Sequence, residues 1–348
     1  MKAAVWHGAK DIRIEEVNLK PLASDEVTIK VAYAGICGSD LHEYQDGPVL
    51  IPTTFPDPLT NEAAPIVLGH EFSGVVEAVG TDVYDFQVGD HVAVNPAITK
   101  RESPDDVYDG YSFIGLSTDG GFAGYVNVPV ENLYPLPKDF SLKLAAVIEP
   151  TAVAVQAIKE AHLTFGQTVV IFGAGPIGAM VTTAAKAAGA TKIVVVDLST
   201  IRLQKALKMG ATDIINPSEV SDVVAAVRQI LPEGADASFE IAGVQATFDQ
   251  AIKTTKARGY MVVVSIYAHA IQFNPMALTN SGVNLTSTIA YSRQTFQQTV
   301  DLVTSGQINV EPIITSEIKL DDIITDGFDV LTADQSQAKI LINLTQEK

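Results

Sequence analysis

Apolar and polar positions are arranged differently in the two halves of the chain. Up to about residue 150, short segments with β-type patterning are interrupted by glycine and proline, and the clearest are residues 26–32, 74–79, 91–94 and 124–128. From residue 151 on, continuous apolar strands alternate with stretches of helical periodicity. The pattern therefore predicts a mostly β region followed by a region of alternating strands and helices.

The alternating region predicts a parallel sheet. Its expected strands are residues 168–172, 192–196, 213–215, 237–240 and 260–265, and its expected helices are residues 176–188, 200–209, 220–230 and 246–255. Because uninterrupted apolar strands are buried on both faces, helices must cover the sheet on both sides. The last part adds a helix at 294–303 and strand-like pieces at 317–320 and 339–342. We expect an α/β protein with one domain from residues 1–150 and 290–348 and another from residues 151–289.

Composition and charge restrict the possible functions. The 348 residues suffice for two domains, and 47% hydrophobic against 18% charged residues excludes a disordered chain. A formal net charge of −18 repels phosphate backbones and anionic lipids, so we expect neither nucleic acid nor a membrane as partner. The single cysteine, Cys37, excludes an internal disulfide and any metal site built from several cysteines. No apolar run approaches the roughly 18 residues of a membrane span, and we expect a soluble, cytoplasmic protein.

A glycine-rich turn lies where the first strand of the alternating region meets its helix. The sequence Gly173-Ala-Gly175-Pro176-Ile177-Gly178 follows the expected strand and opens the expected helix. In a dinucleotide-binding turn the first glycine permits the tight bend, and the second lets the backbone approach the pyrophosphate. The third glycine lets helix and strand pack closely, and the helix N-terminus offers N–H groups to the phosphates. We therefore expect a Rossmann-type, doubly wound coenzyme domain.

Asp197 indicates which dinucleotide this domain binds. It follows the next expected strand, where a carboxylate can accept hydrogen bonds from both ribose hydroxyls and repels a 2′-phosphate. Arg202 is near in sequence, but its position is typical of the outer face of a helix. The sequence thus favours NAD over NADP, with both residues as candidates for the coenzyme site.

Two short clusters in the β-rich region carry side chains that can bind a metal or move a proton. The first is Cys37-Gly-Ser39-Asp40-Leu-His42 and the second is Gly69-His70-Glu71. Both are flanked by glycine, and we expect both in loops. A single cysteine or histidine is more often structural than a ligand. Together they offer the sulfur, imidazole and carboxylate donors that zinc accepts.

With these motifs the chain resembles the zinc-dependent medium-chain dehydrogenase/reductase family, and within it the butanediol and sorbitol-type polyol dehydrogenases. The matching stretches follow the family's order and are residues 34–42, 69–74, 88–90, 120–125, 148–150, 173–178 and 313–315. The resemblance implies a GroES-like, mostly β catalytic domain in addition to the Rossmann domain. It also implies a catalytic zinc ion and NAD(H) as coenzyme.

The resemblance implies roles for individual residues as well. Cys37 and His70 match two catalytic zinc ligands. The third ligand matches Glu149 in some members and Glu71 in others. We favour Glu149 as the resting ligand, with Glu71 as an exchanging or supporting group.

Three further residues of the first cluster match a proton relay and its support. By resemblance, Ser39 would hydrogen-bond the substrate oxygen and His42 would pass its proton on to solvent. Asp40 would orient His70, as metal-binding histidines usually require.

One departure from the family concerns a second metal. Many relatives hold a structural zinc with four cysteines in a lobe after the strand matching 91–94, whereas residues 95–113 contain no cysteine here. Carboxylates alone make a poor zinc site, so we predict one zinc per chain and no structural zinc. By the same resemblance, residues 266–291 lie where subunits extend each other's sheets, which predicts a homodimer or homotetramer.

These features predict the reversible oxidation of an alcohol to a ketone by NAD. Zinc would act as a Lewis acid on the hydroxyl oxygen, and hydride would pass to the nicotinamide. By resemblance the preferred pair is the vicinal diol 2,3-butanediol and its ketone acetoin, with sorbitol or another polyol, or threonine, as the alternative. Two other classes stay open: a metal-free NADPH-dependent quinone or enone reductase, and a protein that binds NADH without turnover.

Overall fold

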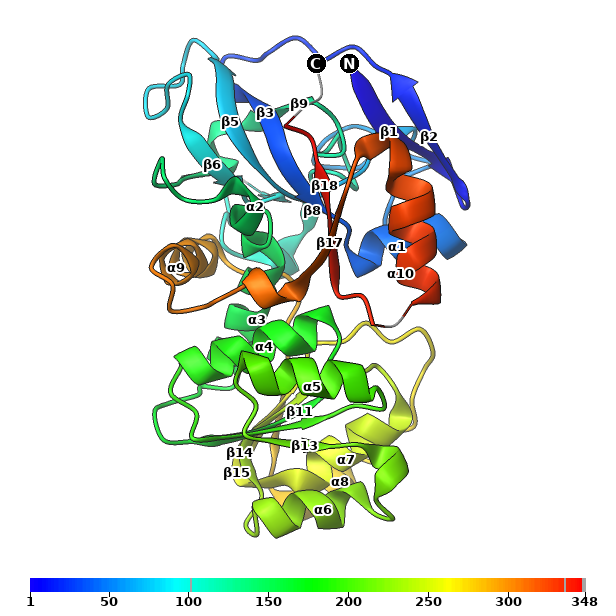
Figure 1. The fold of residues 1–348 in the computed structure, drawn as a ribbon, viewed down its shortest axis with the longest axis vertical. Coiled ribbons are helices and arrows are strands. Elements are labelled where there is room, and N and C mark those ends of the chain that lie inside the picture. Colours follow the sequence, from blue (N-terminus) through cyan, green and yellow to red (C-terminus); the bar gives the residue numbers. More distant parts are fainter. Residues whose placement is uncertain (101, 335, 346–348) are drawn as a thin grey trace. The chain divides into compact units, whose positions relative to one another are not determined.

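The β-rich region folds around a seven-stranded mixed sheet. In the computed structural model, which describes residues 1–100, 102–334 and 336–345, the strand order is β10-β6-β5-β3-β18-β17, with β9 beside β3. These strands are β3 (Glu26–Gly35), β5 (Glu71–Val79), β6 (His91–Val94), β9 (Tyr125–Pro129), β10 (Leu133–Pro135), β17 (Ile314–Ile318) and β18 (Lys339–Asn343). β18 runs antiparallel to β3 and parallel to β17. A late strand thus enters a sheet begun near the start of the sequence (Figure 1, β18 in red).

Two smaller sheets and a helix accompany this sheet. The first small sheet is β2-β1-β4, with β1 (Lys2–Gly8), β2 (Asp11–Glu16) and β4 (Ile66–Val67), and the second pairs β7 (Ala97–Thr99) with β8 (Tyr111–Phe113). The apolar faces meet in one core that contains Trp6, Phe72 and Phe122, each at most 1% exposed. Helix α1 (Gly38–Asp46) follows β3 directly.

The loop expected for the first cluster is wrong, because residues 38–46 form helix α1. The backbone N–H of Cys37 donates to the Asp40 carboxylate at 2.9 Å. This contact caps the first turn of the helix and outweighs the low helix propensity of Gly38 and Ser39. The second cluster is not a loop throughout either, since Glu71 is the first residue of β5.

The alternating region forms the expected parallel sheet. Its order is β13-β12-β11-β14-β15-β16, and every pair in it is parallel. The strands are β11 (Thr168–Phe172), β12 (Lys192–Val196), β13 (Asp213–Ile215), β14 (Ala235–Glu240), β15 (Thr255–Val263) and β16 (Asn284–Ser287). The helices are α3 (Ile148–Glu160), α4 (Pro176–Ala187), α5 (Thr200–Met209), α6 (Val223–Ile230), α7 (Gln245–Thr254) and α8 (Met276–Ser281). The buried strand residues Val170, Val194 and Phe172 explain why the apolar runs are uninterrupted.

The chain divides into two units. The first comprises Met1–Glu149, Ser292–Ser305 and Ile314–Lys348, and the second comprises Pro150–Tyr291 and Gly306–Ile313. Besides its sheets and α1, the first unit contains α2 (Leu142–Ala145), α9 (Arg293–Thr304) and α10 (Asp329–Ala333). A π-helical turn, Ile323–Phe328, leads into α10. Single 3₁₀ turns occur at Val107–Asp109, Val130–Asn132, Pro217–Glu219, Glu311–Ile313 and Leu320–Asp322.

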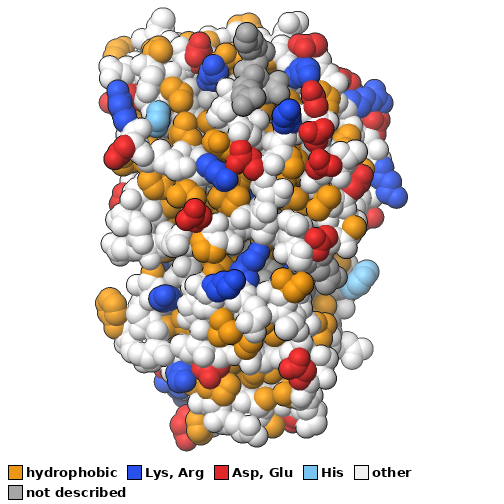
Figure 2. Space-filling view, in the orientation of Figure 1, with side chains coloured by type: hydrophobic (Ala, Val, Ile, Leu, Met, Phe, Trp, Pro, Cys, Tyr) orange, Lys and Arg blue, Asp and Glu red, His pale blue; other side chains and the backbone are white. Residues whose placement is uncertain are grey.

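Among the described residues, no helix combines the length and apolarity needed to cross a membrane. On the face drawn in Figure 2, acidic side chains are interspersed with basic and apolar ones.

Candidate active site

The ends of two paired strands bring the two sequence clusters together. β3 and β5 pair antiparallel with Gly35 opposite Glu71. The residues just after β3 therefore lie next to those at the start of β5. One possible ligand atom from each of Cys37, His70 and Glu71 lies within 4.8 Å of the other two. Among the residues that the structure describes, this is the one group of three or more such side chains close enough to share a metal ion.

Asp40 connects two members of this group. One of its oxygens accepts the Cys37 N–H, and the other lies 3.5 Å from Nδ1 of His70. Asp40 and His70 are both buried, and neither Nδ1 nor the facing oxygen has a hydrogen-bond partner within the described part of the chain. Since Asp40 faces Nδ1, the other ring nitrogen, Nε2, is the one available to a metal, and it lies 3.3 Å from the Ser39 hydroxyl.

The electrostatics of the group favour a positive charge. Burial alone would lower the pKa of His70, but the Asp40 carboxylate and the Cys37 sulfur together raise it well above its ordinary value. A divalent cation would meet the same anionic surroundings. One sulfur, one imidazole nitrogen and carboxylate oxygen form a donor set that fits zinc. The residues present therefore fit the metal that the sequence implies.

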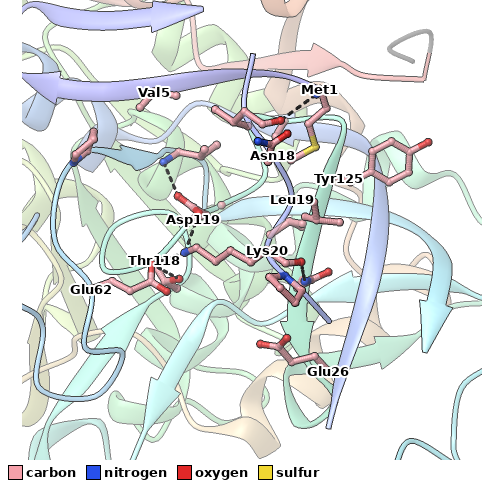
Figure 3. Close-up of a pocket in the computed structure, with 18 of the residues that line it drawn as sticks. Met1, Val5, Asn18, Leu19, Lys20, Glu26, Glu62, Thr118, Asp119 and Tyr125 are labelled. Carbon is pink, nitrogen blue, oxygen red and sulfur yellow. Dashed lines mark hydrogen bonds and ion pairs between the residues drawn. The ribbon is translucent and has the colours of Figure 1, made fainter. Parts of the chain in front are cut away.

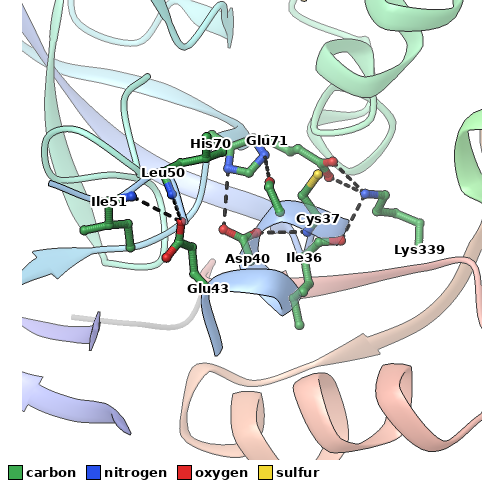
Figure 4. A network of polar contacts seen from close by, with 10 residues as sticks. Ile36, Cys37, Asp40, Glu43, Leu50, Ile51, His70, Glu71 and Lys339 are labelled. Carbon is green, nitrogen blue, oxygen red and sulfur yellow. Dashed lines mark hydrogen bonds and ion pairs between the residues drawn. The ribbon is translucent and has the colours of Figure 1, made fainter. Parts of the chain in front are cut away.

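Glu71 is held by a lysine from near the end of the sequence, as Figure 4 shows. Lys339 on β18 donates to both carboxylate oxygens of Glu71 at 2.6 Å and to the Ile36 carbonyl at 3.0 Å. The Glu71 side chain is 0% exposed and that of Lys339 is 3% exposed. Burial alone would lower the pKa of Lys339, but nearby Glu71, Cys37 and Glu149 raise it overall.

The remaining residues expected at the metal lie as follows. Glu149 is buried in the first turn of α3, near enough to Lys339 to influence its pKa. It is not part of the group formed by Cys37, His70 and Glu71. His42 lies on α1 with an exposed side chain, and Ser39 is half-buried at the start of the same helix.

The glycine-rich turn of the second unit has the geometry expected of a dinucleotide-binding turn. Gly173 has φ +106°, which a residue with a side chain rarely adopts. A Cβ atom on Gly178 would collide with the Gly173 carbonyl oxygen, whereas a Cβ atom on Gly175 would meet nothing within 4 Å. Protein packing thus requires glycine at 178 but not at 175, where the open space suits a bound phosphate. Pro176 and Ile177 open α4 behind this turn.

Asp197 lies directly after β12 and touches this turn. Its carboxylate accepts the Ala174 N–H and the Ser199 N–H, both at 2.7 Å and on different oxygens. Each oxygen keeps a second lone pair, so it can accept a further hydrogen bond. Arg202 lies in the first turn of α5, where its backbone N–H donates to the Ser199 hydroxyl.

The sequence analysis missed two residues that shape the site, Lys339 and Glu43. Glu43 is fully buried on α1, and its carboxylate accepts the backbone N–H groups of Val49, Leu50 and Ile51. Lys339 stands out in the sequence as a lysine at the start of an otherwise apolar strand, but the sequence does not show which residue it binds. No local sequence pattern indicates that Glu43 is buried.

A separate pocket of about 440 Å³ opens elsewhere in the first unit (Figure 3). Across it the Lys20 ammonium binds the carboxylates of Glu62 and Asp119 at 2.6 and 2.8 Å. Neither Cys37 nor His70 lines this pocket. The two carboxylates already neutralise the charge of Lys20. The group of Cys37, His70 and Glu71 is therefore the better candidate for the active site.

Comparison with known proteins gives consistent matches over nearly the whole chain. Residues 23–138 match the alcohol dehydrogenase GroES-like domain, and residues 176–305 match the zinc-binding dehydrogenase family. The (R,R)-butanediol dehydrogenase of Bacillus subtilis is 42% identical over 345 residues, which cover 98% of this chain and 99% of the relative. A sorbitol dehydrogenase of Bacillus subtilis is 33% identical over 332 residues, or 92% and 91% of the two chains. The crystal structure of 2R,3R-butanediol dehydrogenase from Bacillus subtilis has a TM-score of 0.94 at 41% identity and covers 98% of this chain and 99% of that one.

The fold, the donor set and these matches together define a zinc-binding dehydrogenase. The chain belongs to the zinc-dependent medium-chain dehydrogenase/reductase family, so it is an oxidoreductase that acts on a CH–OH group. The expected α/β fold with a GroES-like and a Rossmann domain is confirmed.

Proposed function

We propose that this protein interconverts (R,R)-2,3-butanediol and acetoin with NAD(H) and one zinc ion per chain. The observation that supports the proposal is the convergence of Cys37, His70 and the Glu71 carboxylate, with Asp40 facing the imidazole. The diol is supported by the butanediol dehydrogenases that resemble the chain along almost its full length. Residues 1–150 and 290–348 would hold metal and substrate, and residues 151–289 the coenzyme.

Cys37, His70 and Glu149 would hold the metal, with Glu71 as the exchanging group. When bound, zinc supplies Lewis-acid polarisation of the substrate oxygen. Asp40 fixes the imidazole so that Nε2 is the nitrogen available, and this is the support that metal-binding histidines generally need. Cys37 and one glutamate would balance the charge of the ion.

Ser39 and His42 would move the proton of the alcohol. The Ser39 hydroxyl lies 3.3 Å from His70 Nε2, so it borders the place where substrate oxygen must bind. A hydroxyl can accept one proton while it donates another. His42 has an exposed side chain on the same helix, so it would be able to release the proton to water. When bound, the nicotinamide ring would supply the acceptor for the hydride on the carbon that carries the alcohol.

NAD is the expected coenzyme because Asp197 lies at the turn with two free acceptor positions. A ribose diol can donate to them, whereas the 2′-phosphate of NADP would meet a carboxylate. We also propose a homodimer or homotetramer. β16 lies at the edge of the parallel sheet, where a second copy could add strands.

A polyol is the second candidate substrate, because a sorbitol dehydrogenase is 33% identical over most of the chain. Threonine is a third possibility that rests on the family resemblance alone. A metal-free NADPH-dependent reductase would not need a sulfur, an imidazole and a carboxylate close enough to share a metal ion.

A substrate panel with a metal count tests this proposal. Initial rates with (R,R)-2,3-butanediol, acetoin, sorbitol and threonine are measured with NAD(H) and NADP(H), and zinc per chain is measured by elemental analysis. We expect the highest kcat/KM for butanediol and acetoin with NAD(H), and one zinc per chain. A chelator should abolish turnover while NADH binding persists. Turnover of sorbitol but not of butanediol would assign the protein to the polyol enzymes, and full activity without metal would contradict the zinc mechanism.

A further inference from the structure

Glu240 is a buried carboxylate at the carboxyl end of β14, the strand that pairs with β11 in the parallel sheet. Its two oxygens bind two different segments of the chain. One oxygen accepts the N–H groups of Ala242 and Gly243 at 3.0 and 2.9 Å. The other accepts the hydroxyls of Ser265 and Tyr267, which follow β15, at 2.5 and 2.6 Å. Glu240 therefore ties together the segments that leave two neighbouring strands.

The contacts around Glu240 make these segments rigid. Burial, together with the nearby Glu240 carboxylate, raises the pKa of Tyr267, so its hydroxyl keeps its proton and remains a donor. The Thr247 hydroxyl, in the first turn of α7, adds a third donor to the first oxygen at 2.7 Å. The segments also pack directly, since a Cβ atom on Gly243 would lie 2.9 Å from the Ile266 carbonyl oxygen. Hydrogen bonds to a buried charge are strong, and a satisfied network of this kind holds its members in one arrangement.

Both segments lie where a parallel sheet binds its ligand. The chain runs from β11 through β12 to β13 on one side of the sheet and from β14 through β15 to β16 on the other. The strand order thus reverses between β11 and β14, and ligands bind outside the carboxyl ends of the strands at such a reversal. The segment after β14 also lies against the glycine-rich turn after β11. A Cβ atom on Gly173 would be only 3.3 Å from the Ala242 nitrogen.

Asp197 indicates which half of the coenzyme these segments face. It follows β12 and is expected to bind the ribose of the adenosine half. The phosphates lie at the turn that Gly173 opens, so the nicotinamide half continues on the other side of β11, toward β14 and β15.

We propose that Glu240 is a positioning residue that holds the segments after β14 and β15 in the conformation that receives the nicotinamide half of the coenzyme. This inference rests on the proposed binding of NAD(H). Glu240 is 0% exposed, so it acts through the groups that it binds and not by touching the coenzyme. Its loss should therefore weaken binding of the nicotinamide half and spare the adenosine half.

The experiment measures the two halves separately by calorimetric titration with NADH and with ADP. ADP carries the adenosine and both phosphates but no nicotinamide. The variants are E240A, E240Q and S265A/Y267F, with D236A as the matched control. Asp236 lies near the opposite end of β14, where its carboxylate accepts the N–H and the hydroxyl of Thr168 and pairs with Lys256.

In E240A we expect the Kd for NADH to rise by at least about tenfold, the scale of one hydrogen bond to a charged group. ADP should bind as it does to the wild type. In the coenzyme-free protein, hydrogen exchange at the amides of Ala242 and Gly243 should be faster, because both lose their acceptor. E240Q keeps an acceptor oxygen for these amides, so it should restore slow exchange and most of the NADH affinity. D236A should keep the wild-type ratio of the two Kd values.

S265A/Y267F keeps the test decisive if E240A does not fold. It removes two hydroxyls but leaves the carboxylate and the aromatic ring, and it should weaken NADH binding without weakening ADP binding. Equal losses of NADH and ADP affinity in E240A would show a general structural role and overturn the proposal. Unchanged NADH affinity in E240A or in S265A/Y267F, or the same selective loss in D236A, would also overturn it.

The same titrations separate this inference from the proposed function. A wild type that binds NADH but does not turn over butanediol would refute the proposed substrate and leave the comparison of variants intact. A wild type that prefers NADPH would refute the choice of coenzyme. The test of Glu240 then uses NADPH, which carries the same nicotinamide half.

Discussion

The Asp40 carboxylate faces Nδ1 of His70 at 3.5 Å and accepts the N–H of Cys37 with its other oxygen. One residue thus positions two expected zinc ligands, one through its ring and one through its backbone. It does so from the third residue of α1, where the same carboxylate also caps the helix. Folding of the helix and orientation of the metal ligands are therefore coupled.

Replacing Asp40 with asparagine should weaken zinc binding by about 10- to 100-fold, because the His70 ring loses its charged partner. Competition with a chelator of known affinity measures the change. D46N, at the exposed end of the same helix, is the control. Unchanged zinc affinity in D40N would show that Asp40 serves the helix alone.

Asp197→Ser should lower kcat/KM for NAD by about 10- to 100-fold. Hydrogen bonds to a charged group are worth about 1.5–3 kcal/mol. Losing those expected between the ribose and the Asp197 carboxylate should weaken coenzyme binding. The same change should narrow the preference for NAD over NADP, which parallel kinetics with both coenzymes would measure. Arg202→Gln is the companion variant. A larger loss of NAD activity in R202Q than in D197S would contradict the assignment of Asp197.

Gly178→Ala should lower the stability of the fold, whereas Gly175→Ala should weaken coenzyme binding. A Cβ atom at 178 collides with the Gly173 carbonyl, so G178A should destabilise the fold by about 1–3 kcal/mol. A Cβ atom at 175 meets no protein atom within 4 Å, so G175A should unfold like the wild type. It should still bind NADH at least about tenfold more weakly, equivalent to 1.4 kcal/mol. Thermal unfolding and NADH titration separate the two effects, and normal NADH affinity in G175A would argue against phosphate binding there.

Glu43→Ala should destabilise the first unit by about 2 kcal/mol. Its carboxylate serves three backbone N–H groups at residues 49–51, and at least that of Ile51 is buried. Leaving buried donors without an acceptor carries a cost of this size. Denaturant unfolding gives the free energy, and limited proteolysis should cut first at residues 47–51. Glu43→Gln, which keeps an acceptor oxygen, should lose less stability, and equal losses would point to packing instead.

The contribution of Asp57 to stability should depend on pH. Burial alone would raise its pKa, but hydrogen bonds from Ser112, Thr60 and Leu59 lower it below the usual 3.8. A lowered pKa in the folded state means that the contribution is complete above the unfolded pKa and is lost as pH falls through the folded one. D57N should therefore be less stable than wild type at pH 7, by about 1 kcal/mol. The difference should shrink below about pH 4, and a constant difference between pH 7 and 2.5 would refute the ionic contribution.

The sequence predicted those parts of the molecule whose determinants are local. Continuous apolar runs such as 168–172 and 192–196 are strands because both of their faces are covered, and the parallel sheet is confirmed. Residues 38–46 were predicted wrongly, because glycine and serine suggest a loop and the Asp40 cap decides otherwise. Cys37 and His70 were selected from their chemistry, and the structure brings them together. The preference for Glu149 over Glu71 as resting ligand stays a prediction.

What sequence reasoning could not supply is pairing over long separations. Glu71 and Lys339 are 268 positions apart, and only the insertion of β18 beside β3 brings them into contact. The partners of Glu43 are near in sequence, but their contact depends on how the chain turns after α1. In both cases the local pattern is compatible with an exposed charge.

The insertion of β18 beside β3 has a consequence for biosynthesis. Ile36 and Lys339 are 303 positions apart, so at about 5–20 residues per second a ribosome needs about 15–60 s to deliver the second after the first. Until then residues 33–35 at the end of β3 lack the strand that pairs with them there, and Glu71 has no ammonium partner. The emerging chain therefore lacks this part of the sheet, and the buried partner of Glu71, throughout translation of the coenzyme unit. The topology thus imposes an order on biosynthesis: the ion pair beside the metal-binding group can form only after the coenzyme unit has been made.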